Sequence, residues 1–275
     1  MVHEDDGWAE EPARQRAEVL RHGPRDAGLR VVRQAWPSPP RITGDQQSEA
    51  NVTGVFLTGV TGKLGRRLSD VLVRDGVEVV GLHREEGQAD DLEQRGVTPV
   101  RGDLAVMTEA ELAHVMRGTT AVAFTAGSDG DDESINAIDR DAPARVARAA
   151  QRAGIHRFVL VSVFPEAWVN HELTSSFEHW LRAKREAEIQ LAETDLDWVI
   201  VRPGALTSES GSHTVHVGGA IRYDEVSRDD VARVLAHLLE HTDIHREIVE
   251  LTEGHDRIPA ALQAYANFVR SRHAL

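Results

Sequence analysis

The sequence predicts an α/β fold in which helices cover both faces of a doubly wound, parallel sheet. Residues 52–65 join an apolar, β-branched run to a glycine-rich turn and then to a helical pattern. Apolar strands and helical patterns alternate along the rest of the chain. The run 157–162 is almost continuously apolar, which is typical of a parallel strand buried on both faces.

The glycine-rich turn carries glycine at three spaced positions, Gly59, Gly62 and Gly65. Glycine there lets the chain turn sharply, lets backbone approach a pyrophosphate, and lets the following helix lie close to the sheet. Free amides at the helix start would hold the phosphates. A P-loop is excluded, because Gly62-Lys63 is followed by Leu64 instead of Ser or Thr. A plain tight turn is the alternative, and the downstream pattern favours a dinucleotide site.

Composition limits the possible functions. The 275 residues are 41% hydrophobic, enough for one core, and the net charge of -14 would repel a nucleic-acid backbone. The absence of cysteine excludes disulfides, thiolate metal sites and a cysteine nucleophile. No apolar run approaches the roughly 20 residues of a membrane span, and residues 1–11 are too acidic for a signal peptide. We expect a cytoplasmic monomer or homodimer that binds a small-molecule substrate and neither nucleic acid nor membrane.

Two regions differ in character. Residues 1–50 mix charges and prolines without an apolar period, so we expect a flexible extension; a docking arm for a second subunit is the alternative. Residues 51–275 form the expected dinucleotide-binding domain. Strands are expected at 52–58, 77–82, 97–100, 121–125, 157–162, 198–201 and 248–251, and helices at 64–72, 108–117, 144–153, 175–193, 231–240 and 259–270, with β-structure between 213 and 223.

Six motifs in order resemble the short-chain dehydrogenase/reductase superfamily, in its atypical, NAD(P)H-binding (NmrA-like) group. They are Thr58-Gly59-x-x-Gly62-x-x-Gly65, Gly102-Asp103-Leu104, Thr125-Ala126-Gly127, the strand 158–162, the helix segment 181–188 and Val201-Arg202-Pro203-Gly204. The resemblance implies one Rossmann-type domain whose small substrate-binding region comprises about 163–175 and 204–226. The cofactor contacts it implies are Gly59, Thr61, Gly62, Lys63, Leu64, Gly65, Arg84, Asp103, Leu104, Thr125, Ala126, Gly127, Lys184 and Pro203.

Charge at the end of the second strand predicts NADP(H) in preference to NAD(H). That strand ends in Leu82-His83-Arg84, without the acidic residue that would bind an adenosine ribose. Arg84 and Lys63 are cations that a 2′-phosphate would pair with. A solvated surface arginine beside Glu85 and Glu86 is the alternative for Arg84. For Asp103, the resemblance implies a place under the adenine, and a turn residue bonded to its own loop is the alternative.

The expected catalytic centre departs from the family pattern. Related enzymes place a tyrosine four residues before the lysine, so that the ammonium lowers the phenol pKa. Here Trp180 stands four residues before Lys184. An indole N–H is no acid near neutral pH. Ser162 and Lys184 remain as catalytic candidates. Lys184 would bind the nicotinamide ribose, or alternatively pass Trp180 to solvent from a packed helix face.

Other titratable residues are weaker candidates. His171, Glu172 and His179 could supply a proton, although their spacing selects none of them. His237-Leu238-Leu239-Glu240-His241 fits an H-x-x-E-H zinc pattern. We reject zinc there, because both histidines face away from the apolar stripe of that helix and imidazoles are favoured near a helix C-terminus.

These features predict an NADPH-binding oxidoreductase that reduces a conjugated acceptor such as a quinone or a flavin. The reduced anion of such an acceptor is stabilised by delocalisation and needs no tyrosine. A non-enzymatic NADP(H) sensor is the alternative. Sugar-nucleotide epimerisation is weaker, since it normally needs the missing tyrosine.

Overall fold

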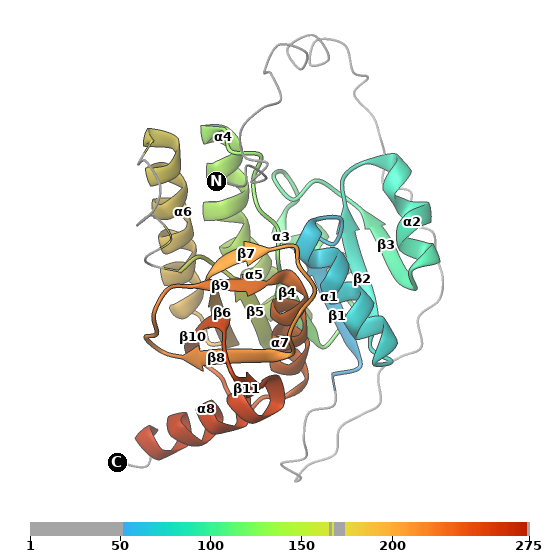
Figure 1. The fold of residues 1–275 in the computed structure, drawn as a ribbon. Coiled ribbons are helices and arrows are strands. Elements are labelled where there is room, and N and C mark those ends of the chain that lie inside the picture. Colours follow the sequence, from blue (N-terminus) through green and yellow to red (C-terminus); the bar gives the residue numbers. More distant parts are fainter. Residues whose placement is uncertain (1–51, 165–166, 168–173, 274–275) are drawn as a thin grey trace, which may run out of the picture. The chain divides into compact units, whose positions relative to one another are not determined.

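A computed structural model describes residues 52–164, 167 and 174–273, so the expected extension 1–50 lies outside the described residues. Their main sheet has the strand order β11-β8-β10-β6-β5-β4-β1-β2-β3 (Figure 1). From β3 to β10 all neighbours are parallel, whereas β8 is antiparallel to β10 and β11. The predicted α/β, doubly wound sheet is confirmed. The strands are β1 (Gly54–Thr58), β2 (Glu78–His83), β3 (Val97–Arg101), β4 (Ala121–Phe124), β5 (Arg157–Val161), β6 (Asp197–Pro203), β8 (Thr214–Gly218), β10 (Glu247–Glu253) and β11 (Asp256–Arg257).

The strand order reverses direction beside β1. The chain runs outward through β2 and β3 on one side, then returns to place β4, β5 and β6 on the other side. In open sheets of this kind, ligands bind at the carboxyl ends of the strands where the order reverses. The reversal therefore places the expected cofactor crevice over the end of β1, between the ends of β2 and β4.

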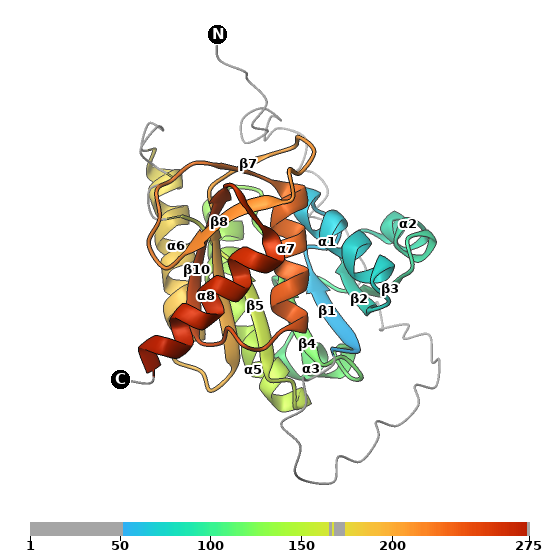
Figure 2. The same cartoon turned by 60° about the horizontal axis from the view of Figure 1, so that its bottom comes forward.

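Helices cover both faces of the sheet (Figures 1 and 2). One core joins α1, α7 and α8 to the sheet, and a second joins α3, α5 and α6 to the opposite face. A separate pair of short parallel strands, β7 (Ala205–Thr207) and β9 (Glu225–Ser227), follows β6. The helices are α1 (Lys63–Arg74), α2 (Ala89–Gln94), α3 (Glu109–Val115), α4 (Asp132–Ser134), α5 (Ala142–Ala153), α6 (Ser175–Ala192), α7 (Arg228–Glu240) and α8 (Ile258–His273), with a 3-10 turn η2 (Glu86–Gln88) and a π-helical segment η3 (Ile135–Asp141).

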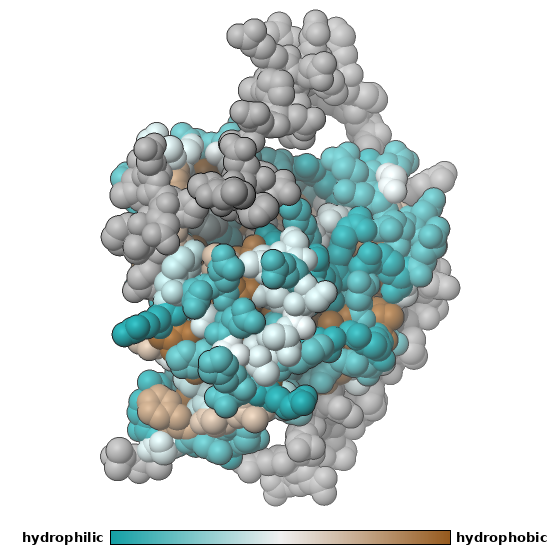
Figure 3. Space-filling model, in the orientation of Figure 1, coloured by the Kyte–Doolittle hydropathy of each residue, from teal (hydrophilic) through white to brown (hydrophobic). Residues whose placement is uncertain are grey.

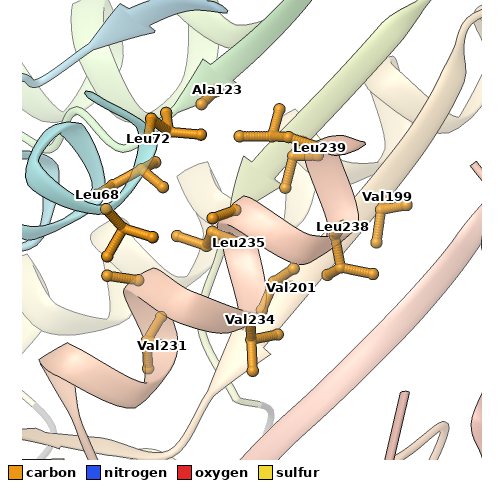
Figure 4. Close-up of a cluster of buried hydrophobic side chains, with 14 of the residues drawn as sticks. Leu68, Leu72, Ala123, Val199, Val201, Val231, Val234, Leu235, Leu238 and Leu239 are labelled. Atoms are coloured by element: carbon orange, nitrogen blue, oxygen red, sulfur yellow. The ribbon is translucent and has the colours of Figure 1, made fainter. Parts of the chain in front are cut away.

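Helix α7 packs against α1 through the predicted apolar stripe. Figure 4 shows Leu235 of α7 facing Leu68 and Leu72 of α1, while other side chains of α7 face the sheet. Val231, Val234, Leu235 and Leu238 are all at most 1% exposed. Their burial stabilises the sheet end that carries the glycine turn, at roughly 1.5–3 kcal/mol for each side chain.

The sequence predicts a capping box at three helix starts, from Thr108 to Glu111, from Ser175 to Glu178 and from Ser227 to Asp230. The capping box from Thr108 to Glu111 is confirmed, and Ser227 accepts from the Asp230 amide at 3.0 Å at the start of α7. The box expected from Ser175 to Glu178 is wrong. Thr174 is the N-cap, and its hydroxyl accepts from the Phe177 amide at 3.2 Å, so α6 begins at Ser175 itself.

Two element boundaries also differ from expectation. The helix expected to begin at Ala144 is preceded directly by α4 and η3, so helical structure begins at Asp132. The strand expected to end at Val201 continues through Pro203, and the chain leaves it at Gly204. Pro203 is tolerated because it is the last residue of β6. A Cβ on Gly204 would lie 1.8 Å from the Asp224 carbonyl oxygen, which fixes glycine there.

The face visible in Figure 3 is mostly hydrophilic, with apolar residues in scattered spots. Large apolar side chains with high exposure among the described residues are Val106, Ile189 and Phe268. Within 52–164 and 174–273, none of the helices combines the length and the apolar character of a membrane span.

Candidate cofactor and active site

The turn after β1 has room only for glycine at its two ends. Gly59 adopts a left-handed φ of 73°, and a Cβ there would lie 2.6 Å from the Ala126 nitrogen. A Cβ on Gly65 would lie 2.1 Å from the Gly59 carbonyl oxygen. The Gly62 amide donates to the same oxygen at 2.9 Å. The turn is therefore held tightly between β4 and α1.

The first turn of α1 fits an anionic ligand. Its N-cap is Gly62, no side chain caps it, and the first turn contains no acidic residue. Lys63 is exposed, whereas Leu64 is buried and the Thr61 carbonyl accepts from Arg66 Nε at 3.0 Å. Uncapped amides at a helix N-terminus bind phosphate. The predicted pyrophosphate fits this turn through main-chain amides and Lys63.

The chain after β4 closes the second side of the crevice. The Thr125 hydroxyl donates to the Thr58 carbonyl at 2.8 Å, which ties the end of β4 to the end of β1. Ala126 packs against Gly59, and Gly127 is exposed. The Ser128 amide donates to Asp139 Oδ2 at 3.2 Å. Small side chains thus line the crevice where cofactor sugars are predicted.

Asp103 forms a hydrogen bond within its own loop, as the alternative interpretation of this residue predicts. Its Oδ1 accepts from the Ala105 amide at 2.9 Å. The Leu104 side chain is buried, and its carbonyl accepts from Arg145 Nη2 at 2.7 Å. Contact between Asp103 and an adenine stays a prediction. Pro203 is likewise buried at the end of β6, beside Leu251 of β10.

Lys184 forms a buried ion pair that the sequence did not predict. Its Nζ lies 2.8 Å from Asp139 Oδ1, and the exposed fractions of the two side chains are 10% and 0%. Asp139 belongs to η3, and π-helical segments are frequent at functional sites. Asp139 directly follows Ile138 and lies three positions before Ala142, and an acidic residue on this apolar helix face was the signal in the sequence that could have indicated the pair.

Trp180 occupies the position of the missing tyrosine. Its ring stacks on Phe177 at a centroid distance of 5.5 Å, and Lys184 Nζ lies 5.8 Å from its ring centroid. The predicted packed face of α6 is confirmed, since Lys184, Ala187 and Leu191 are buried. The ammonium therefore lies between a carboxylate and an aromatic face.

Ser162 lies beside a second buried charge cluster. Arg202 donates to both carboxylate oxygens of Glu188, at 2.9 and 2.7 Å, and its Nη1 lies 3.6 Å from Glu250. Burial raises the pKa of Glu188, but the hydrogen bonds and charge of Arg202, together with a hydrogen bond from Arg185, outweigh it and leave that pKa below its ordinary value. Among the described residues, the buried Ser162 hydroxyl has no hydrogen-bond partner, so it could donate to a substrate carbonyl.

The predicted substrate-binding segments are partly described. Residues 165–166 and 168–173, with His171 and Glu172, lie outside the described residues. Phe164 packs edge to face on Tyr223, at a centroid distance of 5.4 Å, so the two segments meet there. His179 faces η3 and α4, with Nε2 2.9 Å from Asn136 Oδ1 and Nδ1 3.2 Å from Asp132 Oδ1.

The rejected zinc pattern lies on α7, remote from this crevice along the chain. The rings of His237 and His241 lie 4.1 Å apart. Burial, and then the charge of His241, lower the pKa of His237 to about 4. Over the described residues, no group of three potential metal ligands occurs.

This geometry is matched by comparison with known proteins. The profile of the NAD(P)H-binding family matches residues 59–242, from the glycine turn to the end of α7. The chain belongs to this family. The match confirms the predicted Rossmann-type fold and the resemblance to atypical short-chain dehydrogenases/reductases.

Individual relatives agree with that assignment. The chain is 33% identical over 214 residues to an uncharacterized sugar epimerase of Bacillus subtilis, covering 76% of this chain and 98% of the relative. A Bacillus halodurans structure named for NAD-dependent epimerases/dehydratases gives a TM-score of 0.69 at 29% identity, covering 77% and 99% of the two chains. An anaerobilin reductase from Escherichia coli O157:H7 gives 0.64 at 26%, covering 73% and 97%.

Proposed function

We propose that this NAD(P)H-binding protein is an NADPH-dependent reductase of a conjugated acceptor, such as a quinone or a flavin. The observation that carries the proposal is the setting of Lys184. Its ammonium lies between Asp139 and Trp180, and Trp180 stands where related dehydrogenases carry a tyrosine acid. A conjugated acceptor needs no such acid, because delocalisation stabilises its reduced anion. A solved relative named as an anaerobilin reductase supports a reductase.

NADPH is proposed over NADH because the residue that directly follows β2 is the cation Arg84, at the position where an acidic residue would bind the ribose hydroxyls. Arg84 follows β2 and Lys63 opens α1, and both are exposed. A 2′-phosphate gains charge-assisted hydrogen bonds from such groups.

The side chains have separable proposed roles. When bound, the cofactor supplies the hydride. Lys184 donates to the nicotinamide ribose, and Asp139 holds the ammonium in place. Ser162 orients an acceptor carbonyl through its buried hydroxyl, which has no hydrogen-bond partner among the described residues. Phe164 and Tyr223 border the acceptor on the side of the β7–β9 pair.

Turnover with candidate acceptors tests the proposal. The purified full chain is mixed with NADPH and a panel of quinones and flavins, and loss of nicotinamide absorbance is followed. We expect oxidation of NADPH with at least one acceptor and a lower kcat in Ser162→Ala. Tight NADPH binding without turnover on any acceptor would reject a reductase.

The second candidate is a non-enzymatic NADP(H) sensor, which Trp180 favours because it removes the tunable acid. A sensor keeps its full response to NADPH in Ser162→Ala, whereas a reductase loses rate. An epimerase is the weaker third candidate despite the named relative, because Trp180 cannot exchange a proton with a sugar hydroxyl.

A further inference from the structure

Arg84 links two loops across the expected cofactor crevice. From the end of β2, its Nη2 lies 3.8 Å from Asp129 Oδ2, in the loop that follows β4. Its Nε lies 3.2 Å from Glu85 Oε1 on its own loop. Since β2 and β4 flank β1 in the sheet, the Arg84–Asp129 pair crosses the carboxyl end of β1, where the Gly59 turn lies.

A dinucleotide on that turn brings its adenosine ribose toward the end of the second strand. The 2′ position therefore comes to the guanidinium that Asp129 holds. Arg84 and Asp129 are 58% and 59% exposed, so the pair is loose enough to exchange partners. A 2′-phosphate and the Asp129 carboxylate are both anions that compete for Arg84. A 2′-hydroxyl carries no charge and does not compete.

We propose that Asp129 is a specificity-determining residue for the cofactor, acting as the counter-ion that a 2′-phosphate must displace from Arg84. Asp129 thereby lowers the preference for NADPH that Arg84 alone would confer. The inference rests on the proposed binding of NADPH at the turn Gly59–Gly65. Asp129 lies in the loop after β4, across the crevice from β2, so the residues at the end of β2 do not by themselves indicate its effect on cofactor choice.

A double-mutant cycle tests the proposal, with dissociation constants for NADPH and NADH measured by fluorescence titration. Asp129→Asn is expected to tighten NADPH by about two- to fivefold, the range for an exposed ion pair. Affinity for NADH stays unchanged. In the Arg84→Ala background, NADPH binds about tenfold more weakly and Asp129→Asn adds nothing. Glu86→Gln is the matched control. This substitution removes the same charge, but Glu86 pairs with Arg101, at 3.6 Å, and not with Arg84.

Several results would overturn the inference. If the gain in NADPH affinity persists in the Arg84→Ala background, or if Glu86→Gln gives the same gain, the effect comes from the net negative charge of the protein and not from the Arg84–Asp129 pair. Weaker NADH binding in Asp129→Asn would mean that the carboxylate binds the ribose hydroxyl instead. If the wild-type protein binds neither nucleotide, the proposed function fails and this inference fails with it; normal binding with no Asp129 effect overturns the inference alone.

Discussion

The Lys184 ammonium nitrogen lies 2.8 Å from Asp139 Oδ1, and this pair joins α6 to η3 with almost no access to solvent. A buried pair gains little over apolar residues of similar size, but removing one partner leaves the other charge desolvated and unpaired. The pair therefore explains how a lysine tolerates a buried place on α6. It also makes Asp139 a positioning residue for the proposed ribose contact.

Replacing Asp139 should destabilise the fold sharply. Asp139→Ala leaves Lys184 without its carboxylate, and we expect a loss of about 3–5 kcal/mol in the free energy of unfolding. Urea denaturation measures it. Asp132→Ala is the matched control, since Asp132 lies near the same helices but is 71% exposed, and it should cost less than about 1 kcal/mol. Equal effects of the two variants would contradict the buried pair.

Much of the fold followed from the sequence, because its signals are local. The glycine turn, the apolar strands and the stripe of α7 each reflect a period or a backbone requirement of neighbouring residues. The cap of α6 was misplaced by one residue, because Thr174 and Ser175 are both acceptable N-caps and only the structure selects one.

The site was less predictable, because its residues meet through the fold. Asp139 and Lys184 are 45 residues apart in the sequence, and no local sequence pattern indicates that they form a pair. Glu188 ends the helix motif 181–188, but its bond to Arg202 depends on α6 lying beside β6. Asp129 lies in an acidic loop after β4 with no local signal that sets it apart, and the fold places it opposite Arg84.

Replacing Arg202 should destabilise the protein in a pH-dependent way. Arg202→Met leaves Glu188 and Glu250 buried without their shared cation, so we expect a loss of about 3–5 kcal/mol near neutral pH. Arg202 holds the pKa of Glu188 low, and wild-type stability from this carboxylate is present above its unfolded value of 4.5 and is lost below it. The deficit of Arg202→Met should therefore shrink as pH falls below 4.5 and through the lower pKa of Glu188 in the folded protein.

Denaturation curves across this pH range test the prediction. Arg185→Met is the control, because Arg185 contacts the same Glu188 oxygen at 3.0 Å but is 62% exposed. It should cost less than about 1 kcal/mol at any pH. A pH-independent deficit in Arg202→Met would show that the arginine acts by packing and not by charge.

Replacing Gly65 should weaken nucleotide binding. Its added Cβ would meet the Gly59 carbonyl at 2.1 Å, so Gly65→Ala must push α1 away from the turn. We expect at least about tenfold weaker binding of NADPH and NADH alike, because the amides of α1 serve both. Gly87→Ala is the control, since no atom lies within 4 Å of its added Cβ. Unchanged affinity in Gly65→Ala would contradict binding at this turn.

His237 should make stability fall in mild acid. Its folded pKa of about 4 lies below the ordinary value of 6.5, so the unfolded chain takes up a proton that the folded chain rejects between these two pH values. The contribution of the neutral imidazole is full above the upper value and declines as pH falls toward the lower one. His237→Gln removes this group and should flatten the wild-type decline over that window, whereas His255→Gln, at an exposed position, should leave it intact. Identical pH profiles for wild type and His237→Gln in urea denaturation would mean that this ring is readily protonated in the folded protein, and that its packing against His241 is open to water.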